Sequence, residues 1–337
     1  MFMDTLFPVS FFHESTTLFL PFSKSPPVSF ILSQREGLLE SDYSLPYSFR
    51  TMVSLMSQIC RLCVRYVPMS ALRQSAFRKL CRWNQGRNVM VGTQHGFRMR
   101  LEIGDNVENL IFAYGTFERG TSIALRHLAP DRDALVDVGC NIGYFSCLFR
   151  AVNPRGTLFC IDPNEAMIRR TVENLQLNGT EGFQTFTLAA GGEASRAMLH
   201  IPAERHSLAS LAYAPAKGGR LRTTEVDVAP LRALLADSSF QSGLLKVDAE
   251  GFEGEVFRGI DAALARRFAN IIFEYSPSNL TRAGVDPAAL FQLDWLRNFA
   301  VAWIEEDGRA LPALPEELPA IAGPRGGVNL LLTRIAG

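Results

Sequence analysis

Four carboxylates follow an apolar run in segment 243–257, which reads "GLLKVDAEGFEGEVF": Asp248, Glu250, Glu253 and Glu255. A carboxylate at the end of a buried strand can act as a general base, accept a hydrogen bond from a substrate hydroxyl or cap the next helix. In an extended chain Lys246 would share a face with Asp248 and Glu250, and charges cannot enter a dry core unpaired. We therefore expect Lys246 to form an ion pair with one of these two carboxylates.

Two interpretations of these carboxylates compete. Asp248 could be the base or the acceptor of a substrate hydroxyl, with Glu250 as its partner or as a metal ligand. Alternatively, Asp248 caps a helix that begins near Phe252, and the following glutamates favour the positive end of that helix. We assign Asp248 to a catalytic site, leave Glu250 open, and assign Glu253 to the helix dipole and Glu255 to a solvated helix face.

A further carboxylate, Glu274, lies near the end of the expected strand "NIIFEYS" (270–276). If this strand neighbours the one before Asp248, Glu274 faces the same cleft and could bind substrate hydroxyls or, with Asp248, a divalent cation. The alternative is a salt bridge from Glu274 to Arg258 or Lys246. His206, in the connecting stretch "RHSLAS", is a weaker candidate for a base at neutral pH.

The stretch "LVDVGCNIGYFS" predicts a strand ending at Val138, a glycine turn and an immediate helix. Gly139 allows a tight turn and close approach of a ligand to the backbone, and the helix start offers free N–H groups. A nicotinamide-type fingerprint would have a second glycine where Asn141 stands, two residues before Gly143. The turn is therefore not shaped for a pyrophosphate.

The acid Asp162 ends the next expected strand, "TLFCID", about 20 residues further on, where a carboxylate can accept hydrogen bonds from ribose hydroxyls. The alternative is that Asp162 caps the helix after Pro163. Its position after a strand, a glycine turn and a helix favours nucleoside binding.

From residue 91 the sequence alternates between strand-like and helix-like patterns. This alternation predicts an α/β fold with a mostly parallel sheet and helices on both faces. Such sheets bind ligands at the carboxyl ends of their strands. The expected strands are 97–103, 134–139, 157–162, 183–190, 244–249 and 270–276, with a closing pair at 301–307 and 328–335, and the expected helices include 142–152 and 165–177.

The N-terminal part has two segments of different composition. Residues 1–51 are rich in Phe, Ser and Pro without a period, which indicates disorder or translation from too early a start codon. Residues 52–90 contain no acidic residue and seven basic ones. This segment would be a basic amphipathic helix on an anionic membrane or a helical lid on the main domain. We favour the lid, because Pro68 interrupts the helix.

Bulk composition narrows the function classes. The formal net charge is zero, which gives no global basic field for nucleic acid. Three of the six cysteines lie in apolar segments, as buried thiols of a reducing cytosol do. No apolar run reaches the length of a membrane-spanning helix, and the N-terminus is a poor secretory signal. We expect a cytoplasmic protein.

Motifs from about residue 115 to 334 together resemble the FkbM family of class I S-adenosylmethionine-dependent methyltransferases. They are "GTFERGT", "VDVGCNIGYFS", "CIDPNE", the paired asparagines of "ENLQLNG", "HSLASL", "LLKVDAEGFEGEVFRG", "IIFEYSP" and "NLLLTR". The resemblance implies a Rossmann-like, seven-stranded sheet with an antiparallel closing strand. We place this methyltransferase domain at 91–337, because the strand–helix alternation begins near residue 91. It also implies O-methylation, often of a sugar, glycolipid or other hydroxylated metabolite.

The resemblance also assigns cofactor residues. S-adenosyl-L-methionine would lie against a site formed by Glu118, Asp137, Gly139, Asn141, Gly143 and Asp162. Asp137 would orient the amino group of the cofactor, directly or through water. Two features depart from the family pattern: Asp162 stands where Glu is more usual, and Gly191-Gly192 delays the next acid to Glu193.

Two other functions fit parts of this pattern. One is a nicotinamide-dependent oxidoreductase, which Asn141 argues against. The other is a noncatalytic cofactor-binding module that uses its basic helix to bind a partner or a membrane.

Overall fold

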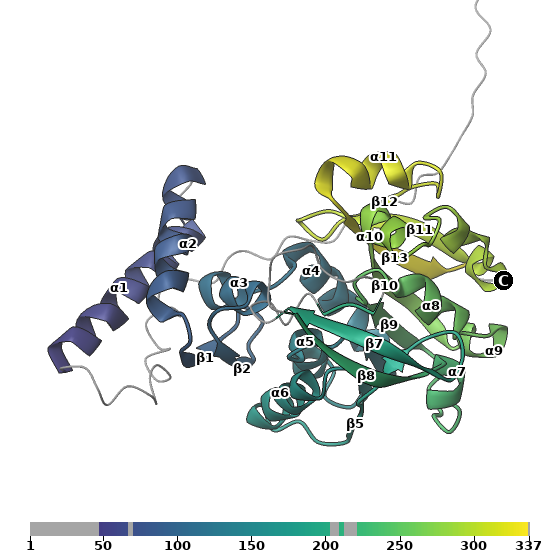
Figure 1. The fold of residues 1–337 in the computed structure, drawn as a ribbon, viewed down its shortest axis with the longest axis horizontal. Helices are drawn as coiled ribbons and strands as arrows, with labels where there is room; N and C mark the ends of the chain where they lie inside the picture. The colour runs from purple at the N-terminus through teal and green to yellow at the C-terminus, as the bar shows by residue number, and fades with distance from the viewer. Residues whose placement is uncertain (1–46, 67–69, 203–208, 212–220, 336–337) are drawn as a thin grey trace, which may run out of the picture. The chain divides into compact units, whose positions relative to one another are not determined.

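The computed structural model describes residues 47–66, 70–202, 209–211 and 221–335, with only the backbone described for residues 47–55, 66 and 70. Its main sheet has eight strands in the order β12-β11-β13-β10-β9-β3-β4-β5 (Figure 1). The five parallel strands are β3 (Ala134–Val138), β4 (Thr157–Ile161), β5 (Phe183–Phe186), β9 (Gly243–Val247) and β10 (Phe268–Tyr275). The antiparallel strands are β11 (Phe299–Ile304), β12 (Ala310–Pro312) and β13 (Val328–Arg334).

Successive residues of the central strand β3 face two separate cores, which shows that helices cover both faces of the sheet. Leu135 joins the core built with α5 (Tyr144–Val152) and α6 (Glu165–Leu177). Val136 joins the opposite core, which includes apolar residues of α8 (Glu253–Arg258). The other helices on that side are α7 (Leu231–Leu234), α9 (Ala262–Ala265), α10 (Pro277–Arg282) and α11 (Leu318–Ala322). The predicted fold class is confirmed.

The sheet reverses its strand order between β3 and β9. From β3 the chain adds β4 and β5 on one side, and β9 and β10 then add on the other. A crevice forms at the carboxyl ends of the strands where the order reverses, and open α/β sheets bind ligands there. The loops after β3 and β9 therefore meet at the expected ligand site.

Several predicted boundaries differ from the structure. The predicted strand 183–190 is wrong, because β5 ends at Phe186 and Ala189–Ala190 form β6 in another sheet, pairing with β8 (Leu221–Ala229). That three-stranded sheet, completed by β7 (Ser195–Pro202), was not predicted, since its strands are largely polar and half-exposed. The three-residue edge strand β12 makes eight strands instead of seven.

The N-terminal segment folds as two helices and the start of a hairpin. Helix α1 spans Tyr47–Tyr66 and α2 spans Ser70–Asn84. The predicted disorder of 1–51 is therefore wrong for residues 47–51, and residues 1–46 lie outside the described part of the chain. The helical segment also does not reach residue 90, because β1 (Asn88–Gly92) pairs there with β2 (Arg98–Glu102).

Helix α1 packs on α3 (Asn106–Tyr114). The Nε of Arg65 donates to the carbonyl of Ala113 at 3.1 Å, and the guanidinium of Arg61 lies 5.2 Å from the ring centre of Phe112. Burial is the main cause that lowers the pKa of Arg61 to about 10, and the positive charge of Arg65 lowers it further. These contacts support the lid arrangement, and no helix in the described ranges is long and apolar enough to cross a membrane.

Candidate active site

The turn between β3 and α5 forms one wall of the pocket at the reversal point. Gly139 has φ +73°, and a Cβ at this position would lie 1.8 Å from the carbonyl oxygen of Asp248. The N–H of Asp248 in turn donates to the carbonyl of Val138 at 3.0 Å. The absence of a Cβ at Gly139 therefore lets the two loops after β3 and β9 pack directly against each other as one unit.

Helix α6 holds the rest of this turn. Gly143 has φ +80°, and a Cβ there would lie 2.9 Å from Cγ2 of Thr171. The carbonyl of Asn141 accepts a hydrogen bond from Oγ1 of Thr171 at 2.6 Å. Asn174 donates to the carbonyl of Ile142 at 2.9 Å, which adds a second anchor from the same helix.

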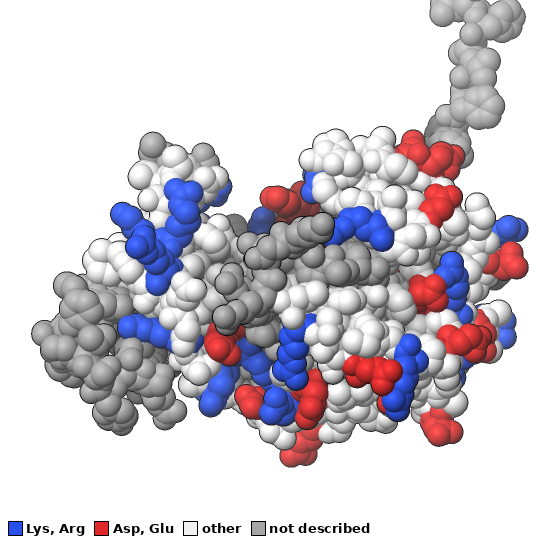
Figure 2. All heavy atoms as spheres, in the orientation of Figure 1, with Lys and Arg blue, Asp and Glu red and all other residues white. Residues whose placement is uncertain are grey.

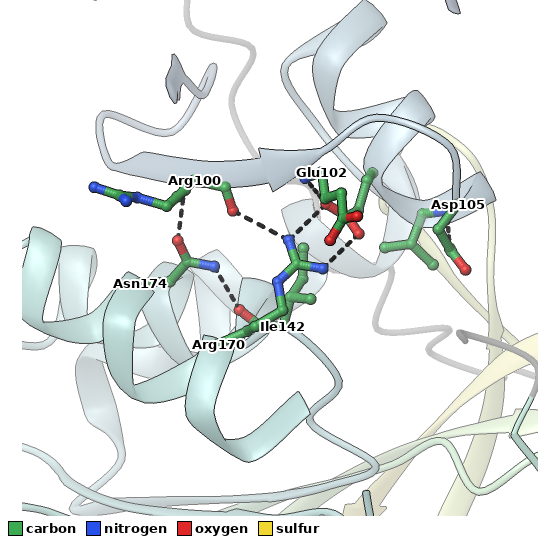
Figure 3. A network of polar contacts seen from close by, with 8 residues as sticks. Arg100, Glu102, Asp105, Ile142, Arg170 and Asn174 are labelled. Atoms are coloured by element: carbon green, nitrogen blue, oxygen red, sulfur yellow. Dashed lines mark hydrogen bonds and ion pairs between the residues drawn. The ribbon is translucent and has the colours of Figure 1, made fainter. Parts of the chain in front are cut away.

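A polar network extends from this anchor to the β1–β2 hairpin (Figure 3). The Oδ1 atom of Asn174 accepts from the N–H of Arg100 at 2.7 Å, so one side chain ties the turn to β2. Arg170 forms an ion pair with the buried Glu108 of α3 at 2.6 Å. Asn178 bonds both backbone groups of Arg98. The paired asparagines of "ENLQLNG" thus position the turn and the hairpin.

The carboxylate of Asp162 holds the glycine turn from the side of β4. Its oxygens accept from the N–H groups of Asn141 at 3.0 Å and Asn164 at 2.8 Å. Burial raises the pKa of Asp162 to about 6, although the two hydrogen bonds act to lower it. The cap of α6 is Asn164, whose side chain accepts from the N–H of Ala166, so the capping alternative for Asp162 is wrong. Each Asp162 oxygen retains a lone pair that a ribose hydroxyl could use.

Asp137 lies beneath the turn and is not part of the pocket wall. It is 1% exposed, and one carboxylate oxygen accepts from the hydroxyl of Ser146 at 2.6 Å. The other oxygen has no hydrogen-bond partner among the described residues. Burial raises the pKa of Asp137, while the charge of Lys246 opposes this. The structure therefore does not place Asp137 where it could touch a bound cofactor directly.

The predicted ion pair of Lys246 is confirmed. Its Nζ lies 2.9 Å from Oδ2 of Asp248 and 4.6 Å from the ring centre of Phe145. Burial alone would lower the pKa of Lys246, but the charges of Asp248, Glu118 and Asp137 outweigh it and raise this pKa. Lys246 therefore stays charged and fixes the side chain of Asp248 at the pocket.

The turn after β9 separates Asp248 from Glu253. Asp248 lines the pocket and does not cap α8, whose N-cap is Phe252 without a side-chain hydrogen bond. Glu253 lies in the first turn of α8, as its assignment to the helix dipole requires, but it also has a second role. Glu253 is 2% exposed, and its Oε1 accepts from the N–H groups of Ala249 at 3.0 Å and Gly251 at 3.2 Å. Glu255 pairs with Arg258 on the helix surface.

Glu250 and Glu274 line the same pocket as Asp248. Burial is the main cause that raises the pKa of Glu250 to about 8 and that of Glu274 to about 9, and the charge of Asp248 adds to both. The strand β9 ends at Val247, so the expected extended alternation does not reach Glu250. The alternative salt bridge for Glu274 is not formed, because Lys246 pairs with Asp248 and Arg258 with Glu255.

Glu118 reaches the pocket from the start of α4 (Arg119–Leu128). Its Oε2 accepts from the amide of Asn329 at 3.2 Å, and burial raises its pKa to about 7. Glu118, Asn141 and Glu250 have φ values of 39°, 50° and 48° and are the only non-glycine residues at positive φ in the described chain. All three line this pocket. Backbone strain of this kind persists where surrounding structure enforces it, and it concentrates at functional sites.

Sequence reasoning missed the amides that position these carboxyl groups. Asn329 lies on β13, and Asn279 of α10 donates to Oε2 of Glu250 at 3.5 Å. No local pattern identifies either one, since each meets its partner only in the folded chain. An apolar wall of Leu188, Ala189 and Ala190 was also missed. Glu193 lies outside the pocket and pairs with Arg232.

The metal alternative for these carboxylates lacks geometric support. Within the described ranges, no three acidic, histidine or cysteine side chains lie close enough together to hold one metal ion. His206 lies outside the described residues.

Replacing Glu274 by Gln should flatten the pH dependence of stability. The folded carboxyl holds its proton up to about pH 9, whereas the unfolded one ionises above its ordinary value of 4.5. The contribution of Glu274 to folding is therefore largest below that ordinary value and declines as pH rises towards the folded pKa. Urea unfolding at several pH values between these limits should show a smaller decline for Glu274→Gln. The exposed Glu316→Gln is the control, and parallel curves for wild type and Glu274→Gln would contradict a protonated Glu274.

The strand order, the antiparallel β13 beside β10 and the pocket at the β3–β9 reversal define a Rossmann-like class I methyltransferase fold. Within it, residues 137–301 match the family model of the methyltransferase FkbM domain. This match identifies residues 137–301 as an FkbM-type methyltransferase domain.

Three known proteins show the range of similarity. Methyltransferase 1 of Beauveria bassiana (strain ARSEF 2860) is 28% identical over 168 residues, which cover 44% of this chain and 67% of that protein. Ribosomal RNA small subunit methyltransferase C of Aliivibrio salmonicida (strain LFI1238) is 31% identical over 72 residues, or 21% of each chain. The crystal structure of precorrin-6y C5,15-methyltransferase from Geobacter metallireducens GS-15 aligns with a TM-score of 0.34 and 12% identity over 65% of this chain and 87% of that one.

Proposed function

We propose that this methyltransferase uses S-adenosyl-L-methionine to methylate a hydroxyl of a neutral acceptor, such as a sugar, a glycolipid or another hydroxylated metabolite. The observation that carries the proposal is a single pocket with two kinds of wall. One wall is the glycine turn with Asp162, and the other holds Asp248, Glu250 and Glu274. A nucleoside site and a set of hydroxyl-binding carboxyl groups therefore adjoin.

The residues of the first wall fit the cofactor. Asp162 offers acceptor oxygens for ribose hydroxyls, and Leu188, Ala189 and Ala190 offer an apolar surface for the base. Asn141 leaves the turn without the glycine that a nicotinamide cofactor requires, which argues against the oxidoreductase alternative.

The residues of the second wall suit a neutral hydroxyl. S-adenosyl-L-methionine supplies an activated methyl group, so the chain chiefly has to hold the acceptor oxygen close and in line. Asp248 would take the proton of the acceptor hydroxyl while the hydroxyl oxygen bonds to the methyl carbon and the carbon–sulfur bond breaks. Glu250 and Glu274, when protonated, can donate to neighbouring acceptor oxygens.

The described wall of the pocket has no unpaired cation for an anionic acceptor. Its described wall carries five carboxyl groups, from Glu118, Asp162, Asp248, Glu250 and Glu274. Lys246 is the only lysine or arginine on that wall, and Asp248 already pairs with it. Even with Glu250 and Glu274 protonated, this wall offers no unpaired cation that could bind a phosphate or carboxylate of the acceptor. This supports a neutral acceptor over nucleic acid.

The variant Asp162→Ala should weaken binding of S-adenosylhomocysteine about ten-fold or more, since it removes charged hydrogen bonds to the ligand. Isothermal titration calorimetry measures the effect. Asp162→Glu should restore binding, and Asp286→Ala, an exposed aspartate outside the pocket, is the control. Unchanged affinity in Asp162→Ala would overturn the ribose assignment.

Transfer of label from methyl-labelled cofactor to fractions of an extract of the source cells would identify the acceptor. Cofactor binding without transfer to any fraction would favour the noncatalytic alternative. Transfer to a nitrogen or carbon atom would overturn the proposed O-methylation.

A further inference from the structure

Helix α1 has an apolar face that points away from the core. Met56, Ile59 and Leu62 are 39%, 44% and 48% exposed, and their spacing of three residues places them along one side of the helix. Roughly opposite Ile59 and Leu62, the helix buries Cys60 and Val64 in the core at 8% and 1% exposure. Such a helix can pack one apolar side against the domain and contact a second apolar environment with the other side.

Helix α2 also exposes apolar residues, together with basic ones. Leu72 and Trp83 are 53% and 40% exposed, and Lys79 lies between them on the same helix face, at spacings of seven and four residues. The amide of Asn84 on α2 donates to Oγ of Ser57 on α1 at 3.1 Å, and both residues are buried. The two helices therefore form one packed unit, which we call the α1–α2 face.

This unit concentrates exposed apolar residues. The described chain has nine exposed large apolar residues, and five of them lie on α1 and α2. Scattered single residues of this kind are normal on protein surfaces, but a cluster marks an interaction site.

The charge of the same segment has one sign. Residues 52–90 contain no Asp or Glu, and their basic residues are Arg61, Arg65, Arg73, Arg78, Lys79, Arg82 and Arg87. Figure 2 shows Lys and Arg side chains gathered over α2 without Asp or Glu among them. Because Arg61 and Arg65 contact α3, the exposed positive charge lies on α2, at Arg73, Arg78, Lys79 and Arg82.

We propose that the α1–α2 face rests on an anionic lipid bilayer, with Met56, Ile59, Leu62 and Trp83 in the interface and the basic residues of α2 at the headgroups. Helices that lie on membranes combine an apolar face with Lys and Arg, and Trp is enriched at the headgroup level. Neither helix can span the bilayer, so the contact is peripheral. The proposal is independent of the methyl acceptor.

A lipid surface fits this face better than another copy of the chain. Each basic residue near anionic headgroups strengthens membrane binding roughly five-fold. The acyl region accepts apolar side chains without a shaped partner pocket. The rest of the chain is net acidic and could attract the basic residues of a second copy. The experiment must therefore distinguish lipid binding from self-association.

Co-sedimentation of the full chain with vesicles tests the apolar part of the proposal. We expect binding to vesicles of three parts phosphatidylcholine and one part phosphatidylglycerol, and much weaker binding to phosphatidylcholine alone. Ile59→Asp with Leu62→Asp should lower binding about ten-fold or more, because charge is costly in the interface. Leu314→Asp is the matched control, since Leu314 is 57% exposed on another part of the chain.

The basic part is tested by Arg78→Gln with Arg82→Gln. Each lost charge should weaken binding to the anionic vesicles roughly five-fold, and high salt should weaken wild-type binding as well. Arg297→Gln is the control, because its side chain is 72% exposed on another part of the chain. All these side chains are exposed, so an unchanged thermal unfolding midpoint should confirm that the variants fold.

Two results would overturn the proposal. One is absence of binding to anionic vesicles, or binding that neither double variant weakens. The other is a concentration-dependent dimer in light scattering that both double variants abolish, which would assign the α1–α2 face to a second copy of the chain.

Discussion

Replacing Asp248 by Asn should lower turnover of the acceptor about a hundred-fold or more, while S-adenosylhomocysteine binds within a few-fold of wild type. Asn keeps the shape of the side chain and can still accept a hydrogen bond from Lys246. It cannot take a proton at neutral pH, so only the transfer step should suffer. Single-turnover formation of S-adenosylhomocysteine in the presence of the identified acceptor measures this step directly.

The control for this variant comes from the same segment. Glu255→Gln changes a carboxylate that pairs with Arg258 on the surface of α8 and does not line the pocket, so its turnover should match wild type. Near-normal turnover of Asp248→Asn would leave Asp248 with only a structural role, as the partner of the buried Lys246. Glu250 or Glu274 would then be the next candidates for the base.

Replacing Gly139 by Ala should destabilise the protein by about 2–5 kcal/mol and weaken cofactor binding strongly. Part of this loss is the cost of a left-handed conformation for a residue with a Cβ, since φ is +73°. The rest arises because the new Cβ would lie 1.8 Å from the carbonyl oxygen of Asp248, a backbone atom that moves only if the loop after β9 moves. Urea unfolding and calorimetry with S-adenosylhomocysteine measure the two effects.

A second glycine separates these two causes. Gly179 has φ +66°, and a Cβ there would meet no atom within 4 Å. Gly179→Ala should therefore cost only the conformational strain, roughly 1–2 kcal/mol, and leave cofactor affinity unchanged. Equal losses in the two variants would contradict a special contact between the turn after β3 and the turn after β9.

The two predictions concern one piece of structure. The carbonyl of Asp248 packs against Gly139, and the side chain of Asp248 faces the pocket. A change at Gly139 therefore displaces the proposed base as well as the cofactor turn. For this reason we expect turnover in Gly139→Ala to fall further than its loss of cofactor affinity explains.

Local patterns in the sequence determined the elements around the site. The predicted helix 165–177 has the bounds of α6, and β3 and β4 lie where expected. The sequence also predicted that Lys246 pairs with Asp248 or Glu250, because alternate residues of an extended segment share a face, and the structure forms the pair with Asp248. These signals are readable because strand and helix periods, turns and near-neighbour contacts depend on only a few consecutive residues.

Only the tertiary structure decided what each polar group does. Glu253 has the sequence context of a helix-dipole residue, but burial turns it into the acceptor for Ala249 and Gly251. The groups that hold Glu118 and Glu250 come from Asn329 and Asn279 on other elements. Contacts between distant residues and the burial that raises carboxyl pKa values exist only when the whole chain packs, so local sequence reasoning identified carboxylates that line one pocket but not the bonds that hold them there.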